Sequence, residues 1–211
     1  MPSPQESHRL YVWDLPIRLA HWLLVALFAF SYWSAESGNM EYHRYSGYTV
    51  LGVLMFRLYW GVFGSVTARF AEFVKGPRVV RQYIGAMSAR VSCQSAGHNP
   101  LGALSVLALL GALLLQVGLG LFAVDVDGIE SGPLSSWVSF ATGRACAKAH
   151  AVVFNMLLAL VAMHVAAILF YLVVKRDNLT VAMITGTKSL AENAARAAVT
   201  APLARVVVGL V

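Results

Sequence analysis

Charged residues are scarce in this chain, and cysteines are scarcer still. Only 12% of the 211 residues are charged and only two are cysteines, whereas 58% are hydrophobic. About a quarter of the residues in a typical soluble domain are charged, so this composition excludes an ordinary soluble protein. Neither Cys93 nor Cys146 stands in a CxxCH motif, which excludes a covalently attached haem of the c type. No small-residue cleavage site follows a basic start, so we expect no cleaved signal peptide.

Long apolar runs are what the chain has instead, and they predict an integral membrane protein. Three runs carry no charged residue, and a fourth carries only Arg57. Each is near or above the roughly 20 residues that span a hydrocarbon core. We therefore expect an all-α chain with a membrane domain at residues 1–188 and a short C-terminal tail at residues 189–211. The four expected membrane helices cover about residues 16–36, 43–65, 99–124 and 148–175.

The basic residues predict the orientation of these helices. Of the sixteen Lys and Arg, twelve lie on one side of the membrane and only Arg44, Arg144 and Lys148 on the other. By the positive-inside rule, both termini and the loop between the second and third helices are cytoplasmic. The acidic loop between the third and fourth helices then faces outward. The net charge of +6 thus reflects membrane topology, and no motif for nucleic-acid binding accompanies it.

Four histidines lie on or at the ends of the expected membrane helices, where a histidine is costly and indicates function. His43 and His150 begin the second and fourth helices at the outer surface. His21 and His164 lie about 22 and 24 Å below that surface at 1.5 Å per residue. The four side chains therefore form two pairs at matching depths. A single such histidine could instead be satisfied by headgroups or by another helix.

Two imidazoles per pair are the axial ligand set of a six-coordinate haem. A site of histidines and carboxylates fits poorly, because the apolar runs contain no acidic residue. We therefore predict two b-type haems. His21 and His164 would bind the iron of an inner haem, and His43 and His150 that of an outer haem. Gly47 and the glycines of the third helix would let a macrocycle approach, although plain helix packing also uses such residues.

Two further positions are candidates for the inner level of the membrane. Arg57 lies fourteen residues after His43, on nearly the same helix face and about 21 Å deeper. Haem propionates could neutralise it, or it could extend to the inner interface. His98 and Asn99 precede Pro100 at the inner surface. They could bind a quinone headgroup or a propionate, or Asn99 could simply cap the third helix.

Several phrases make the chain similar to a known family. They run from VWDLPIRLAHWL through HRYSGY and FRLYWGVFG, and end with NLTVAMITGTK after the spaced His150 and His164. The chain resembles the bacterial cytochrome b561 group, which includes the b-type cytochrome subunits of nickel–iron hydrogenases. The resemblance implies a four-helix membrane bundle in the bacterial inner membrane, two non-covalent haems b, and electron transfer linked to quinone. The same four histidines would be the haem ligands.

The function expected from these observations is electron transfer by a subunit of an oxidoreductase complex. A periplasmic cytochrome c, or a dehydrogenase or hydrogenase subunit, would exchange electrons at the outer haem, and quinone would exchange them within the membrane. One alternative is a partner-independent quinone reductase that uses a small diffusible donor such as superoxide. Transient binding of haem or metal by a transporter or chaperone is a second alternative, and a structural membrane anchor without cofactor is a third.

Overall fold

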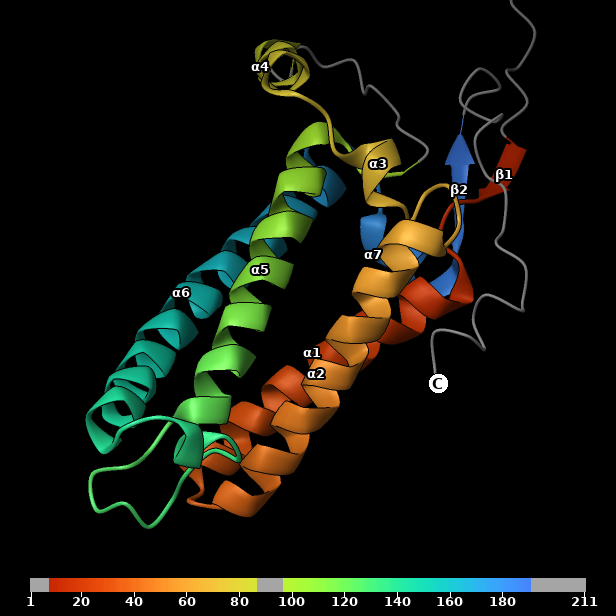
Figure 1. Cartoon of the computed structure of the whole chain (residues 1–211). Helices are drawn as coiled ribbons and strands as arrows, with labels where there is room; N and C mark the ends of the chain where they lie inside the picture. The colour runs from red at the N-terminus through yellow and green to blue at the C-terminus, as the bar shows by residue number, and fades with distance from the viewer. Residues whose placement is uncertain (1–7, 87–96, 191–211) are drawn as a thin grey trace, which may run out of the picture. The chain divides into compact units, whose positions relative to one another are not determined.

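The computed structural model describes residues 8–86 and 97–190, which are mostly helical (Figure 1). Four long helices dominate, and short elements precede, join and follow them. The long helices are α1 (Leu15–Glu36), α2 (Met40–Phe63), α5 (Pro100–Phe122) and α6 (Phe140–Val173). The short elements are β1 (His8–Tyr11), α3 (Phe70–Phe73), α4 (Pro77–Ala86), the 3₁₀ turn Ser135–Trp137, α7 (Leu179–Thr185) and β2 (Thr187–Leu190).

Helices α1, α5 and α6 are long and apolar enough to cross a membrane. Helix α2 is equally long, at 24 residues, but several polar residues lower its mean hydropathy. The described residues therefore contain three clear candidate spans, and α2 as a fourth stays a prediction. Helix α6 begins at Phe140, well before the expected start near residue 148, so residues 140–147 belong to the same helix.

The chain divides into two compact units, and each long helix contributes to both. The described part of the first unit comprises residues 8–20, 56–86, 97–106 and 164–190. Its core contains Trp13 and Trp60 with smaller apolar side chains around them. The Asp14 carboxylate caps α1 by accepting from the backbone N–H of Ile17 at 3.0 Å, and it accepts from Trp60 Nε1 at 2.9 Å. One buried acid thus fixes both the start of α1 and the end of α2.

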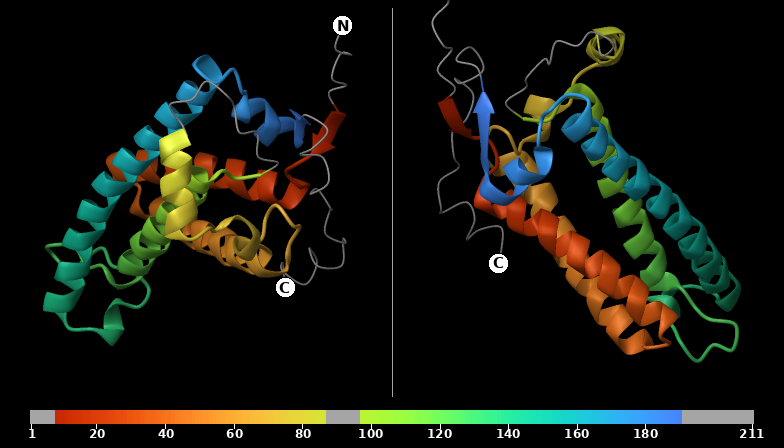
Figure 2. Two further views of the ribbon diagram at one scale, coloured as in Figure 1. Left: turned by 90° about the horizontal axis from the view of Figure 1, so that it is seen from above. Right: turned by 180° about the vertical axis from the view of Figure 1, so that it is seen from behind.

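A two-stranded antiparallel sheet joins the two ends of this unit, a feature that the all-α expectation did not include. Strand β1 pairs with β2 beside α7, as the right view in Figure 2 shows. Directly after β1 and directly before β2, the backbone N–H groups of Val12 and Trp13 both donate to the carbonyl of Gly186. Gly186 has a φ of +82°, and a Cβ there would lie 2.7 Å from the Trp13 carbonyl oxygen. Only glycine fits this turn.

The second unit comprises residues 21–55 and 107–163. A tight turn with Gly38 at a φ of +72° joins α1 to α2, and the loop of residues 123–139 joins α5 to α6. The ring of Phe154 on α6 stacks on two aromatic side chains of α1, with centroid distances of 5.9 Å to Phe28 and 5.3 Å to Tyr32. Aromatic stacking thus connects the first and last long helices of this unit.

Candidate cofactor site

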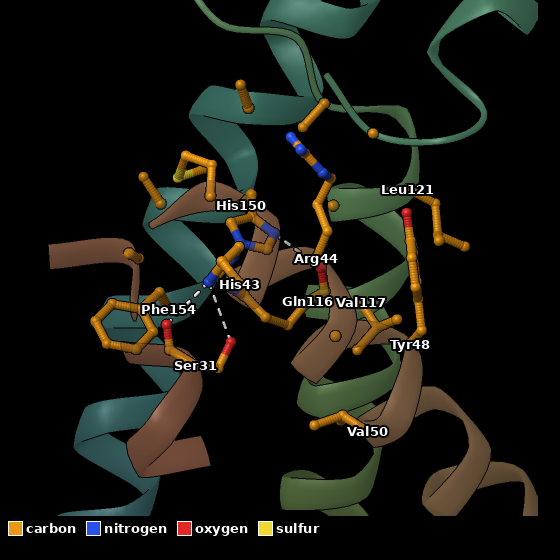
Figure 3. A pocket seen from close by; sticks show the side chains of 18 of the residues that line it. Ser31, His43, Arg44, Tyr48, Val50, Gln116, Val117, Leu121, His150 and Phe154 are labelled. Carbon is orange, nitrogen blue, oxygen red and sulfur yellow. Dashed lines mark hydrogen bonds between the residues drawn. The ribbon is translucent and has the colours of Figure 1, made fainter. Parts of the chain in front are cut away.

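His43 on α2 and His150 on α6 approach each other inside the second unit (Figure 3). Their ring centroids lie 6.0 Å apart, and the ring planes are nearly perpendicular at 81°. Both side chains are only partly exposed. The structure thus brings together two histidines that are far apart in the sequence and that sequence analysis assigned to one pair.

The Nδ1 atom of each ring is held by a backbone carbonyl. His43 Nδ1 lies 2.9 Å from the carbonyl oxygen of Ser31 and 3.1 Å from its hydroxyl oxygen. His150 Nδ1 lies 2.9 Å from the carbonyl oxygen of Gln116 on α5. A carbonyl oxygen can only accept, so Nδ1 carries the proton in both neutral rings. Each Nε2 is then left with its lone pair, which is the arrangement that metal-binding imidazoles use.

The rings belong to the wall of an apolar cavity of about 360 Å³. All four long helices line it, together with part of the α5–α6 loop. At Gly120, α5 packs closely against the His150 ring, because a Cβ there would lie 3.1 Å from its Cε1 atom, tighter than ordinary contact. At Gly47, one turn after His43, a Cβ would meet nothing within 4 Å. The cavity is therefore open at Gly47, near His43, whereas α5 packs closely against His150 at Gly120.

Polar groups gather at one end of the cavity wall. Arg44, next to His43, forms an ion pair with Glu130 of the α5–α6 loop. Gln116 Oε1 and Asp125 Oδ1 are buried with no hydrogen-bond partner among the described residues. Buried oxygens of this kind usually have a partner, so they mark places where a bound group or water would contribute donors.

The spacing of the two rings fits a metal ion between them. Two metal–nitrogen bonds of about 2 Å, and about 1 Å from each nitrogen to its ring centre, give about 6 Å between centroids. Within residues 8–86 and 97–190, no three His, Cys, Asp or Glu side chains are placed to hold a bare metal ion. Two imidazoles and an apolar cavity suit an iron whose other four ligands come from a flat macrocycle.

The other predicted pair, His21 and His164, is divided between the two units. His21 begins the part of α1 that belongs to the second unit, and His164 begins the part of α6 that belongs to the first. The His21 ring makes an edge contact with Trp22, with centroids 5.0 Å apart. The pairing of His21 with His164 therefore stays a prediction.

Arg57 is buried in the first unit, with only 7% of its surface exposed. Its guanidinium carbon lies 4.9 Å from the ring centroid of Phe70, a cation–π contact. Its Nη1 atom has no hydrogen-bond partner among the described residues. The buried cation that the sequence predicts is present, and part of its hydrogen-bonding capacity is unused.

His98 and Asn99 have separate surroundings in the same unit. Asn99 accepts from the N–H of Gly102 at 2.8 Å, so it caps α5, and its amide donates to the Tyr171 hydroxyl at 2.9 Å. His98 lies between Trp13 and Phe73, with ring centroids 4.5 Å from each. Burial, with the nearby Arg57 and His164, lowers the pKa of His98 to about 3, so its ring is neutral at physiological pH.

Sequence analysis missed the groups that orient the cavity histidines. Neither Ser31 nor Gln116 carries a sequence signal for this role, because each acts through a backbone carbonyl that every residue has. The Arg44–Glu130 pair was missed because a loop separates its two members in the sequence and only folding brings them together.

Helices long and apolar enough to span a membrane, with two imidazoles 6.0 Å apart in the wall of an apolar cavity, indicate a membrane protein with a candidate cofactor site. The family model for prokaryotic cytochrome b561 matches residues 12–186. The chain belongs to this family, which confirms the resemblance seen in the sequence. No curated protein and no solved structure matches the chain. It is a multi-pass membrane cytochrome of the b type, which binds haem b and takes part in electron transfer.

Proposed function

We propose that the chain is a di-haem cytochrome that carries electrons between a partner redox protein and the quinone pool of the bacterial inner membrane. In this proposal α2 is the fourth membrane span of a four-helix bundle and both termini are cytoplasmic. The excess of basic residues on the terminal side supports this orientation. The cavity between His43 and His150 is then near the outer surface and accessible to a partner from outside.

The mutual approach of His43 and His150 is the observation that carries the proposal. Their 6.0 Å separation matches an iron ligated by both Nε2 atoms, and both Nδ1 atoms are already engaged. Haem b bound there supplies an iron that accepts and releases one electron at a time. The carbonyl groups of Ser31 and Gln116 keep each ring in one tautomer and orientation, so little rearrangement accompanies ligation.

The other groups of the cavity have supporting roles. Phe28, Tyr32 and Phe154 would cover one side of a bound macrocycle and exclude water from it. Arg44, which pairs with Glu130 beside the cavity, would offer a cation to a propionate. Exclusion of water and nearby positive charge both act on the reduction potential of such a centre.

A second haem, held by His21 and His164, completes the proposed path across the membrane. Sequence spacing supports this pair, because it predicts His21 and His164 at the same depth. His21 lies on α1, which contacts His43 through Ser31, and His164 lies on α6, which also carries His150. The buried Arg57 supports it indirectly, because a buried guanidinium with an unused donor is well suited to a propionate.

The test is haem stoichiometry. The protein purified in mild detergent should contain two haems b per chain in a pyridine haemochrome assay, with low-spin spectra. His150→Ala should lower this to about one, since one of the two axial pairs is removed, and His164→Ala should do the same at the other site. His8→Ala is the matched control and should keep both haems. Full haem content in His150→Ala would disprove the assignment of the outer site.

A further inference from the structure

The α5–α6 loop presents large apolar side chains to solvent. Val126 is 72% exposed and Ile129 is 80% exposed, and Asp127 and Gly128 lie between them. We call residues 126–129 the loop tip. Such exposure is expected on the membrane-facing sides of helices, but the loop tip lies outside every helix.

The loop tip has a defined conformation. The N–H of Asp125 donates to the carbonyl of Glu130 at 2.9 Å, and Val124 and Ser131 form an antiparallel bridge below it. Gly128 has the positive φ of 73° that this reversal requires. At the base of the loop, Arg144 donates to the Val124 carbonyl at 2.8 Å. The two apolar side chains are therefore presented by an ordered hairpin.

The same loop forms part of the wall of the histidine cavity. Asp125, Glu130 and Pro133 line the cavity, and Glu130 pairs with Arg44, the neighbour of His43. The loop tip and the cavity wall are thus two faces of one short segment. A protein bound at the loop tip would lie next to the candidate cofactor site.

Charge defines the kind of protein that would bind there. The loop, residues 123–139, contains three acidic residues and no Lys or Arg. The whole second unit has five acidic residues against three basic ones, a net charge of −2 in a chain whose net charge is +6. An apolar centre with an acidic surround complements a partner with a basic surround. Insertion into lipid is disfavoured, because Asp127 would have to be buried with its neighbours.

We propose that the loop tip is the docking surface for a soluble electron-transfer protein with a basic face. The inference rests on the proposed function, in which the nearby cavity holds the outer haem. Val126 and Ile129 would form the apolar centre of the contact, and the exposed Asp127 between them would attract and orient the partner. Docking there gives the partner a short path to the haem.

The experiment uses the haem-loaded full-length protein in lipid nanodiscs and a basic, soluble c-type cytochrome as the probe. The docking variant is Asp127→Asn with Ile129→Ser. The matched control is Glu72→Gln with Val79→Ser, which changes an exposed acid and an exposed apolar residue in the first unit. Stopped-flow absorbance measures the second-order rate of electron transfer to the probe, and an equilibrium titration measures its binding.

We expect the docking variant to lower the rate and the affinity by about five- to tenfold at low salt, and the control to leave both unchanged. The difference should shrink above about 0.5 M salt, where screening is strong. Transfer to a small neutral quinone should be equal in all three proteins. Equal rates and affinities for the wild type and the docking variant would overturn the inference.

Two further readouts separate the possible failures. If the wild type contains no haem but binds the probe through the loop tip, the proposed function fails and the docking surface stands. A fluorescent label on Ile129→Cys, in a chain without Cys93 and Cys146, reports on lipid insertion. Quenching of this label by nitroxide lipids, and not by an aqueous quencher, would overturn the docking surface.

Discussion

Single atoms decide whether the two cavity histidines can act as ligands. A metal-binding imidazole usually donates its other ring N–H to an acceptor that sets its tautomer and orientation, and here backbone carbonyls lie within hydrogen-bonding distance of both Nδ1 atoms. Sequence spacing predicted His43 and His150 as one pair, and the structure brings their rings to 6.0 Å, because rise per residue is a local property of a helix. It could not identify Ser31 or Gln116 as the acceptors, since every residue offers a carbonyl.

The close contact at Gly120 leads to a prediction at this scale. A Cβ at Gly120 would lie 3.1 Å from His150 Cε1 and 3.3 Å from Nδ1, which is tighter than ordinary contact. Gly120→Ala should therefore displace the ring and lower the haem occupancy of the outer site severalfold. Gly111→Ala, on the same helix with nothing within 4 Å of its Cβ, is the control and should leave occupancy unchanged. Haem titration by absorbance measures both, and equal occupancies would contradict the packing argument.

At the scale of elements, α1 shows how one side chain joins local and tertiary structure. The sequence predicts that the first helix begins near residue 16, and the structure has α1 begin at Leu15, directly after Asp14. The second role of Asp14, accepting from Trp60 Nε1, has no sequence signal because the two residues are 46 apart. The β1–β2 pairing was missed for the same reason, since short four-residue strands at opposite ends of the chain reveal little on their own.

Removal of the Asp14 carboxylate should therefore destabilise the first unit. Loss of the cap costs about 1 kcal/mol, and leaving the buried Trp60 N–H unpaired costs about 1–3 kcal/mol more. We expect Asp14→Ala to lower the apparent Tm of the protein in nanodiscs by several degrees. Glu72→Ala removes only the exposed ion pair with Arg69 and should change the Tm little. An equal Tm for both variants would show that Asp14 contributes no more than a surface acid.

At the scale of the whole molecule, hydropathy and basic residues predict the placement in the membrane. Three helices meet the length and apolarity of a span, and α2 is as long but contains more polar residues. Membrane insertion depends on summed transfer free energies along each segment, so it can be read without knowledge of side-chain contacts. The predicted orientation places Cys146 outside and Cys93 inside.

Thiol labelling tests this orientation. In intact cells, a membrane-impermeant maleimide should label a chain that keeps only Cys146, which is partly exposed at the start of α6. A chain that keeps only Cys93 should be labelled only after lysis. The opposite pattern would invert the topology and place the docking surface in the cytoplasm.

The apolar runs already specify membrane helices, the quoted phrases specify the family of this chain, and the spacing of the histidines predicts paired ligand positions. These properties are local or periodic, because they depend on the hydropathy and rise of one segment at a time. Folding was needed to select the partners of each side chain. Three kinds of contact depend on this step: the carbonyls that hold His43 and His150, the Arg44–Glu130 pair and the strand pairing. Each joins residues of separate elements, so it exists only once these elements have packed together.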